Sequence, residues 1–426
     1  MQISKTTFNG KKKQHHVNIC IPKEVVVEIL QRVPCQDLYQ ILKEVCMLWC
    51  SIIYSGRFAY SHVERGILKS SSSFSQLEAV VINMTDDKRS VIVSAFEWHS
   101  PPSYKLEEHE RYWESTYIYT VNDVLISTVH NIREMMRVNS VNGFVCFCTD
   151  DACLHVCNPI TREYFTTPPY SYDTNMAYFR LAAVGFGFCH LSYEYKVVVL
   201  YRDAECLKSG VIKPFVLTVG TDRSWRSLKA IPDTKIISRM KTGAHVKGVL
   251  YWYKKSCTRE DWPRHSKRIE RLICFDLTKE EFDMIMVPAE IDGVQGGGQY
   301  ATSIAEKGGN LCLINVSEGC FWSLFIQVYV AHSTTDLSSI KSWKKEFTVT
   351  VPNIAYNTKI NHLFFLIVTD DMLVIQLNEA QTYGFLNVAT GILLDIVDLH
   401  WSHIIIPYVP SLVTLFHRPQ QLQHTK

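Results

Sequence analysis

Four cysteines in a short stretch of the chain, Cys146, Cys148, Cys153 and Cys157, are the residues whose type and spacing come nearest to a metal site. Structural zinc sites favour pairs of thiolates about two residues apart on turns. Cys146 and Cys148 instead alternate within an apolar run, where a thiol packs as a small hydrophobic group. We therefore predict that these cysteines lie in a packed β core and bind no metal.

Other residues that could do chemistry are weaker candidates. Cys46 and Cys50 lie one helical turn apart in a region of helical spacing, and the run Gly293–Gly298 lacks the Lys-Ser/Thr pair of a phosphate-binding loop. The 16 histidines are scattered and form neither the His-Glu-x-x-His helix of a metalloprotease nor part of a serine elbow. The sequence therefore predicts no catalytic residues, no metal and no cofactor.

Aromatic and basic side chains in loop-like stretches are candidates for contacts with a protein partner. Exposed aromatic and Arg side chains dominate the binding free energy of many protein interfaces. The residues of this kind that we select as hypothetical substrate contacts are Tyr170, Tyr172, Trp262, His265 and Arg268.

The composition indicates a folded protein whose partner is another protein. Hydrophobic residues make up 47% of the 426-residue chain and charged residues 20%. The formal net charge of +2 attracts neither nucleic acid nor an anionic membrane strongly. The basic N-terminus is followed by no apolar run, and no run is long enough to cross a bilayer. We expect a soluble protein of the cytoplasm or nucleus with reduced cysteines.

The segment that follows Pro22 has the periodicity of a small helical unit. Apolar residues repeat at helical spacing between Pro22 and Pro34, and a second set repeats from Leu38 to Ile53, with Asp37 available as a helix cap. We predict two helices, the second continuing to Tyr54. So few helices bury too little apolar surface alone, so they must pack on the rest of the chain or on a partner helix pair.

This segment resembles the F-box motif. The resemblance is carried by Ile21-Pro22, Glu28-Ile29-Leu30, Val33-Pro34, Leu38, Val45-Cys46, Trp49 and Phe58. It implies that the helices bind a Skp-type adaptor, which connects F-box proteins to a cullin and a RING subunit. The residues that it implies for this interface or its supporting core are Pro22, Ile29, Leu30, Val33, Pro34, Leu38, Val45, Cys46 and Trp49.

Two positions depart from the motif. Met47 stands where a basic residue usually follows the Val-Cys pair, and the stretch between Pro34 and Val45 is longer than usual by a single residue. Both departures bear on the affinity for the adaptor. They leave open a second function, that of an F-box scaffold acting outside a ligase.

Beyond Ser73 the helical period gives way to short runs rich in Val, Ile, Tyr, Phe and Trp, separated by turn residues. Similar segments recur at a spacing of about fifty to sixty residues, which is near the length of a kelch-like propeller blade. About six blades would fit between Ser75 and Phe416; a sandwich or two stacked β domains are the alternatives. We predict that the apolar run from His403 to Phe416 supplies the strand that closes the β domain.

The β region resembles the plant F-box-associated domain. The motifs that carry this resemblance are Asn142-Gly143, Cys157-Asn158-Pro159, Gly185-Phe186-Gly187, Tyr195-Lys196-Val197-Val198, Ser224-Trp225-Arg226, Gly248-Val249-Leu250-Tyr251-Trp252, Phe275-Asp276-Leu277 and Tyr408-Val409-Pro410-Ser411-Leu412. At Cys189-His190 the chain departs from the family, which more often has an aromatic residue and an Asp there. The resemblance implies a β domain that binds a target protein.

The predicted fold class is multidomain, α plus all-β: a small helical F-box followed by a β-propeller-like domain. The predicted boundaries are a tail at 1–18, the F-box at 19–62, a linker at 63–74, the β domain at 75–416 and a second tail at 417–426. The resemblance implies a non-catalytic substrate-recognition subunit of an SCF-type (Skp, cullin, F-box) ubiquitin ligase. The alternatives are the F-box scaffold and a propeller-fold enzyme.

Overall fold

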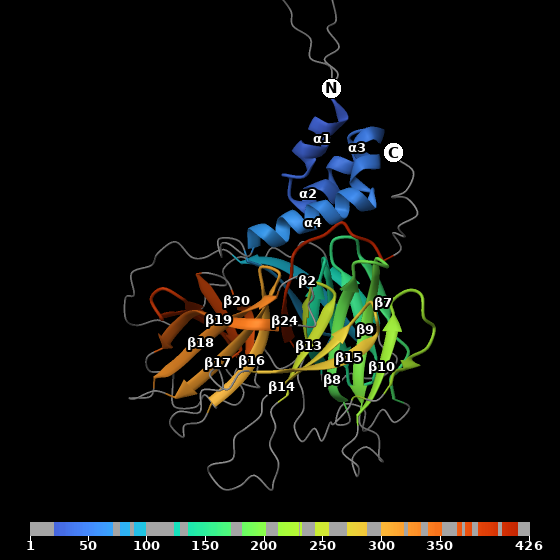
Figure 1. Ribbon diagram of the computed structural model, residues 1–426. Coiled ribbons are helices and arrows are strands. Elements are labelled where there is room, and N and C mark those ends of the chain that lie inside the picture. Colours follow the sequence, from blue (N-terminus) through green and yellow to red (C-terminus); the bar gives the residue numbers. More distant parts are fainter. Residues whose placement is uncertain are drawn as a thin grey trace, which may run out of the picture.

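The computed structural model describes residues 21–70, 77–85, 89–98, 123–127, 135–171, 181–201, 212–229, 231, 243–254, 271–287, 300–318, 323–333, 340–351, 364–368, 371–376, 382–398 and 403–415. These residues form a small helical domain and a ring of β-sheets, with the helices on one face of the ring (Figure 1). Within these ranges, no helix combines the length and the apolar character needed to cross a membrane.

The helical domain contains α1 (Lys23–Leu30), α2 (Cys35–Gln40), the short 3-10 helix η1 (Leu42–Glu44), α3 (Met47–Ile53) and α4 (Gly56–Ser70). Pro22 precedes α1 with φ −55°, and Pro34 precedes α2 with φ −53°. A proline suits this place because its φ is fixed near the helical value and the N–H it lacks would have no partner within the helix. The two prolines therefore determine where α1 and α2 begin.

The prediction of one helix from Leu38 to Tyr54, capped by Asp37, is wrong in two respects. Asp37 is not its cap, because α2 already begins at Cys35 with Pro34 in the N-cap position. The chain also does not stay helical to Tyr54: α2 ends before Ile41, and Cys46 is extended, with φ −163° and ψ 164°. Packing within the domain thus overrides the helical periodicity of the sequence.

The segment predicted as a linker, 63–74, is helical as far as Ser70, because α4 continues through it. Val63 is buried, and Ile67 packs against the same apolar cluster. An amphipathic face of this kind is stabilised by burial against a neighbour. The helical part of the chain is therefore longer than the F-box segment predicted at 19–62.

The described strands form six four-stranded antiparallel sheets, with the orders β24-β1-β2-β3, β4-β5-β6-β7, β11-β10-β9-β8, β12-β13-β14-β15, β16-β17-β18-β19 and β20-β21-β22-β23. The strands are β1 (Leu77–Met84), β2 (Ser90–Trp98), β3 (Asp123–Ser127), β4 (Met135–Val141), β5 (Phe144–Thr149), β6 (Leu154–Asn158), β7 (Glu163–Thr166), β8 (Leu181–Cys189), β9 (Glu194–Tyr201), β10 (Lys213–Thr218), β11 (Arg226–Ser227), β12 (Ala244–Val246), β13 (Val249–Lys254), β14 (Arg271–Asp276), β15 (Glu281–Met286), β16 (Tyr300–Lys307), β17 (Asn310–Glu318), β18 (Leu324–Ser333), β19 (Ile340–Val351), β20 (Phe364–Val368), β21 (Met372–Gln376), β22 (Thr382–Asn387), β23 (Leu393–Asp398) and β24 (His403–Pro407).

One strand at the edge of each sheet contacts the corresponding strand of the next sheet. β24 contacts β4, β4 contacts β8, β8 contacts β12, β12 contacts β16, β16 contacts β20, and β20 contacts β24, so the contacts form a closed ring. Sheets arranged radially in this way make a β-propeller. The sequence prediction of a helical domain followed by a β-propeller is confirmed.

The ring is closed by pairing the end of the β domain with its beginning. β24 lies antiparallel to β1, with Ile404 opposite Ile82 and Ile406 opposite Val80. Without β24, the apolar strand β1 would present an unpaired edge. The predicted closing strand within 403–416 is thus confirmed for His403–Pro407.

Glycines on β8 allow two neighbouring sheets to approach closely. A Cβ on Gly185 would lie 2.7 Å from the Trp252 ring, and a Cβ on Gly187 would lie 2.6 Å from Leu277 Cδ1. The Trp252 indole also donates a 3.0 Å hydrogen bond to the carbonyl oxygen of Val184. The Gly-Phe-Gly motif and the motif that ends at Trp252 therefore fit together at a contact between sheets.

The helical domain shares its core with the propeller. Tyr60 of α4 stacks on Phe188, and it meets Tyr193 edge to face, with ring centroids 5.4 Å apart in both pairs. The Tyr39 hydroxyl donates to the carbonyl oxygen of Thr161 at 3.4 Å. A single apolar cluster extends from Leu30 in α1 to Phe188 in β8. The propeller thus fixes the position of α4.

Candidate functional site

Exposed apolar side chains lie on α1, on α3 and on the segment that joins α2 to α3. α1 and α3 lie at the end of the helical domain that is away from the propeller (Figure 1). Met47 is 86% exposed, Ile41 60% and Val45 57%. A large exposed apolar patch marks an interaction site on a soluble protein. We name the docking surface by its residues: Val25, Ile29, Ile41, Val45, Met47 and Leu48.

The helix α1 is apolar on two faces. Val26 and Leu30 are buried in the core, whereas Val25 and Ile29 point outward and are about half exposed, at 46% and 48%. Residues four apart share a face of a helix, so each pair forms a separate apolar strip. A helix that is apolar on both faces is typically covered on both. The outer strip of α1 is therefore suited to a partner.

The break between α2 and α3 exposes the other half of the docking surface. In a continuous helix, Ile41 and Val45 would follow Leu38 on the buried face at spacings of three and seven. Leu38 is fully buried, but the extended backbone at Cys46 leaves Val45 and Met47 exposed. From the sequence we did not assign Val25, Ile41, Met47 and Leu48 to the interface, because the assignment followed the positions that match the F-box motif, and a motif does not show which side chains are exposed.

The structure separates the predicted adaptor-binding residues into three groups. Pro22, Ile29, Pro34, Val45 and Cys46 are exposed, and Val33 and Trp49 are partly buried. Leu30 and Leu38, by contrast, are 0% exposed. A partner cannot touch these two leucines, so their assignment to an interface is corrected: they form the supporting core.

Polar contacts hold α1 against α4 behind the docking surface. Arg65 of α4 lies 3.3 Å from the Glu28 carboxylate, and Gln31 donates to the Ser61 hydroxyl at 2.9 Å. His62 forms a 2.9 Å hydrogen bond with the carbonyl oxygen of Val33. Hydrogen bonds from Arg32 and then Arg65 lower the pKa of Glu28. These contacts fix α1 on the helix that lies on the propeller.

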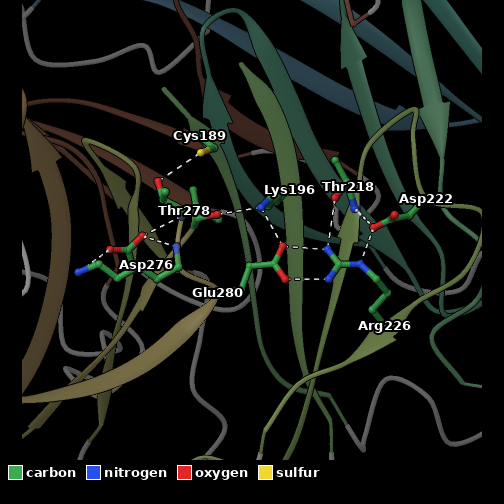
Figure 2. Close-up of polar contacts among 10 residues, drawn as sticks. Cys189, Lys196, Thr218, Asp222, Arg226, Asp276, Thr278 and Glu280 are labelled. Atoms are coloured by element: carbon green, nitrogen blue, oxygen red, sulfur yellow. Dashed lines mark hydrogen bonds and ion pairs between the residues drawn. The ribbon is translucent and has the colours of Figure 1, made fainter. Parts of the chain in front are cut away.

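A second group of polar residues ties the sheet of β8–β11 to the sheet of β12–β15 (Figure 2). Lys196 donates to the Glu280 carboxylate and to the carbonyl oxygen of Leu277, both at 2.8 Å. Arg226 binds Glu280 through two nitrogens, at 2.7 and 2.8 Å, and Asp222 through a third at 3.0 Å. Hydrogen bonds from Arg226 are the main reason that the pKa of Glu280 falls to about 2. This carboxylate stays deprotonated near neutral pH, so the group acts as a tie between sheets.

The four clustered cysteines are core residues. Cys146 and Cys157 are 0% exposed, Cys148 1% and Cys153 3%. Burial raises the pKa of Cys148 to about 12, so its thiol remains protonated. The prediction that these side chains pack in the β core is confirmed.

A buried hydrogen-bond chain lies beside these cysteines. The Thr149 hydroxyl donates to the Asp151 carboxylate and lies 3.0 Å from His155 Nε2, and the Thr166 hydroxyl lies 3.0 Å from His155 Nδ1. Because the Thr149 hydroxyl donates its proton to the carboxylate, it accepts from Nε2–H. Burial lowers the pKa of His155 to about 4, so the imidazole is neutral near pH 7. Nδ1 then carries no proton, and the Thr166 hydroxyl donates to it.

We expect acid to unfold the propeller partly through two histidines, His155, which is buried, and His245, which is partly buried. Burial lowers the pKa of both His155 and His245 to about 4, from an ordinary value of 6.5. The unfolded chain therefore binds more protons between these values, and stability present above pH 6.5 is lost as pH falls toward 4, at up to about 1.4 kcal/mol per pH unit for each histidine. Urea unfolding at several pH values, on the parent chain and on His155→Gln, would measure this. An equally steep pH dependence in both would contradict it.

The predicted substrate contacts receive one correction. Tyr170 is only 9% exposed, and its ring meets that of Tyr201 edge to face at 6.0 Å. Its backbone N–H is also held by the carbonyl oxygen of Ala152 at 2.9 Å. Tyr170 therefore belongs to the core rather than to an exposed loop. Tyr172, Trp262, His265 and Arg268 lie outside the described residues, as does the run Gly293–Gly298.

Comparison with known proteins agrees with this architecture. The model of the F-box associated beta propeller domain matches residues 104–415. A putative F-box protein of Arabidopsis thaliana is 24% identical over 331 residues, which cover 76% of this chain and 80% of the relative. A second putative F-box protein of Arabidopsis thaliana is 25% identical over 319 residues, 71% of each chain. Since the family match spans well over half of the sequence, this chain belongs to the plant F-box proteins with an F-box associated β-propeller domain.

Proposed function

We propose that this protein is the substrate-recognition subunit of an SCF-type ubiquitin ligase. Its docking surface binds a Skp-type adaptor, and its propeller binds the protein to be ubiquitinated. The observation that carries the proposal is the exposed apolar surface on α1 and the η1–α3 segment, in an F-box domain whose other side is packed on the propeller. Such a surface fits a partner that contributes helices of its own.

In this proposal the protein acts by proximity. The adaptor end and the target end lie on different domains of one chain, so a target lysine is held near a loaded conjugating enzyme at high effective concentration. The chain is then a non-catalytic receptor that requires no cofactor, and it acts in the cytoplasm, the nucleus or both. Each of the six sheets serves as one propeller blade.

The target-binding residues remain predictions. Tyr172, Trp262, His265 and Arg268 retain the role that their residue types suggest, because aromatic and Arg side chains make the strongest contacts in protein interfaces. Recognition residues on a shared scaffold usually lie in its connecting loops. Tyr170 is removed from this group because it is buried.

The adaptor role is tested by placing charge on the docking surface. Val45→Asp combined with Met47→Asp should leave the domain folded, because both side chains are exposed. It should weaken binding to a purified Skp-type adaptor by on the order of 100-fold, since a desolvated carboxylate would lie in the interface. Isothermal titration calorimetry gives the dissociation constant.

The matched control is Met286→Asp. Met286 is 54% exposed, and it lies on β15 of the propeller, not in the helical domain. This variant should bind the adaptor like the parent chain. Unchanged binding by the double variant would exclude the docking surface as the adaptor site. If the purified complex contains the adaptor but no cullin, the result would favour the alternative function, an F-box scaffold that acts outside a ligase.

A further inference from the structure

The segment that follows the closing strand is buried at four of its eight positions and exposed at none, although it has no regular secondary structure. Residues 408–415 come directly after β24. Tyr408 and Leu412 are 4% exposed, and Ser411 and Val413 are 0% exposed. Figure 1 shows this part of the chain, in red, passing beneath α4. A buried irregular backbone requires hydrogen-bond partners outside itself, because it makes no ladder of its own.

The sheet β4–β7 supplies those partners. The Asn158 amide nitrogen donates to the carbonyl oxygens of Ser411 and Val413, each at 2.9 Å. The backbone N–H of Leu415 donates to the Glu163 carboxylate at 2.9 Å. Gly143 leaves the space that Ser411 fills, because a Cβ there would lie 2.1 Å from Ser411 Cβ. The second half of the segment is therefore fixed to this sheet at Ser411, Val413 and Leu415.

The same segment contacts the helical domain. A Cβ on Gly66 of α4 would lie 2.9 Å from Val409 Cγ1, so the helix and the segment meet where α4 has no side chain. Leu412 and Val413 belong to the apolar cluster that contains Val63 of α4. The segment is thus packed between the last helix and the propeller.

The side chain at position 158 is specific to this role. Asn158 and Asp276 occupy corresponding turns of two sheets, where each side-chain oxygen accepts the backbone N–H two residues later, at 3.0 and 2.8 Å. A carboxylate performs that part of the task as well as an amide. Donation to two carbonyl oxygens requires an NH₂ group, which Asp lacks. The amide of Asn158 therefore serves the C-terminal segment in addition to its turn.

We infer that residues 408–415 form a clasp that holds the F-box domain on the propeller. Closing the ring through β24 and seating α4 are then linked, because one continuous stretch of chain does both. The functional consequence rests on the proposed function: the clasp fixes the position of the adaptor relative to the bound target.

Hydrogen exchange measured by mass spectrometry tests the clasp. A chain that lacks residues 408–426 keeps β24 and loses the clasp, whereas its control lacks only residues 416–426. We expect amide exchange in α4 at least about 10-fold faster than in the control, since α4 would open locally. Exchange in β16–β19, on another part of the ring, should not change. Unchanged protection of α4 would overturn the inference.

Point variants decide the matter if the deletion prevents folding. Asn158→Asp keeps the oxygen that accepts the hydrogen bond in the turn, but it removes the NH₂ group that donates to Ser411 and Val413. It also places a carboxylate against these two carbonyl oxygens. Amide exchange in α4 should therefore become faster in this variant as well. Asp276→Asn is the matched control and should leave α4 protected. Normal α4 protection in Asn158→Asp would overturn the clasp. The affinity of the same variants for the adaptor is measured separately and should not change. A loss of adaptor binding would therefore count against the proposed function, whereas α4 exchange tests the clasp.

Discussion

Gly143→Ala is expected to destabilise the propeller by about 3–5 kcal/mol. Gly143 has φ +85°, a conformation that costs an L-residue strain energy. Its new Cβ would lie 2.1 Å from Ser411 Cβ and 3.0 Å from Ser411 Cα. Ser411 cannot move away easily, because it is fully buried and its carbonyl oxygen is bound by Asn158. Urea unfolding followed by tryptophan fluorescence would report the loss.

Gly248→Ala is the control that separates strain from collision. Gly248 has nearly the same φ, +84°, at the corresponding turn between β12 and β13. A Cβ there would meet no atom nearer than 3.8 Å, so this variant should lose only the strain term, about 1–2 kcal/mol. Equal losses in the two variants would show that Ser411 does not constrain position 143.

Leu30→Asp is expected to unfold the helical domain while leaving the propeller sheets formed. Leu30 is 0% exposed and lies in the core of the helices. The variant removes a buried leucine and introduces a group whose charge has no partner there, at a cost of about 4 kcal/mol or more. A domain of this size has little stability to lose. Hydrogen exchange should rise throughout α1 and α2, and adaptor binding should disappear as a result.

Ile29→Asp distinguishes loss of fold from loss of contact. Ile29 is the neighbour of Leu30 but is 48% exposed, so its variant should keep native exchange rates in α1 and still bind the adaptor weakly. If Ile29→Asp also unfolds the helices, the docking surface is part of the core. If Leu30→Asp remains folded, the assignment of Leu30 to the core is wrong.

The structural roles of the family motifs explain why several short patterns identify this fold. Lys196 and Arg226 meet at Glu280 between two sheets, and Trp252 fills the space left by Gly185 in the next sheet. Asn158 anchors the C-terminal segment. These motif residues lie at contacts inside the propeller. The residues that distinguish one target from another are therefore to be sought outside these motifs.

The local pattern of residues in the sequence was enough to predict several elements of the fold and some of its core residues. Apolar spacing predicted α1, and the two prolines mark where α1 and α2 begin. The change of period after Ser73 predicted the β region, whose strands begin at Leu77. Alternation within an apolar run placed Cys146 and Cys148 in a β core, and the apolar run after His403 predicted the closing strand. These features depend on residues near one another in the chain, so periodicity reveals them.

Tertiary structure alone decided which apolar residues are available to a partner. Leu30 and Ile29 are adjacent and similarly apolar, yet one is fully buried and the other half exposed. Tyr170 is buried although its stretch looked like an exposed loop. The clasp likewise joins Asn158 to Ser411, 253 residues further along the chain. Contacts between distant segments arise when whole elements pack to bury apolar surface, and the spacing of residues within one element does not specify which of its faces another element will cover.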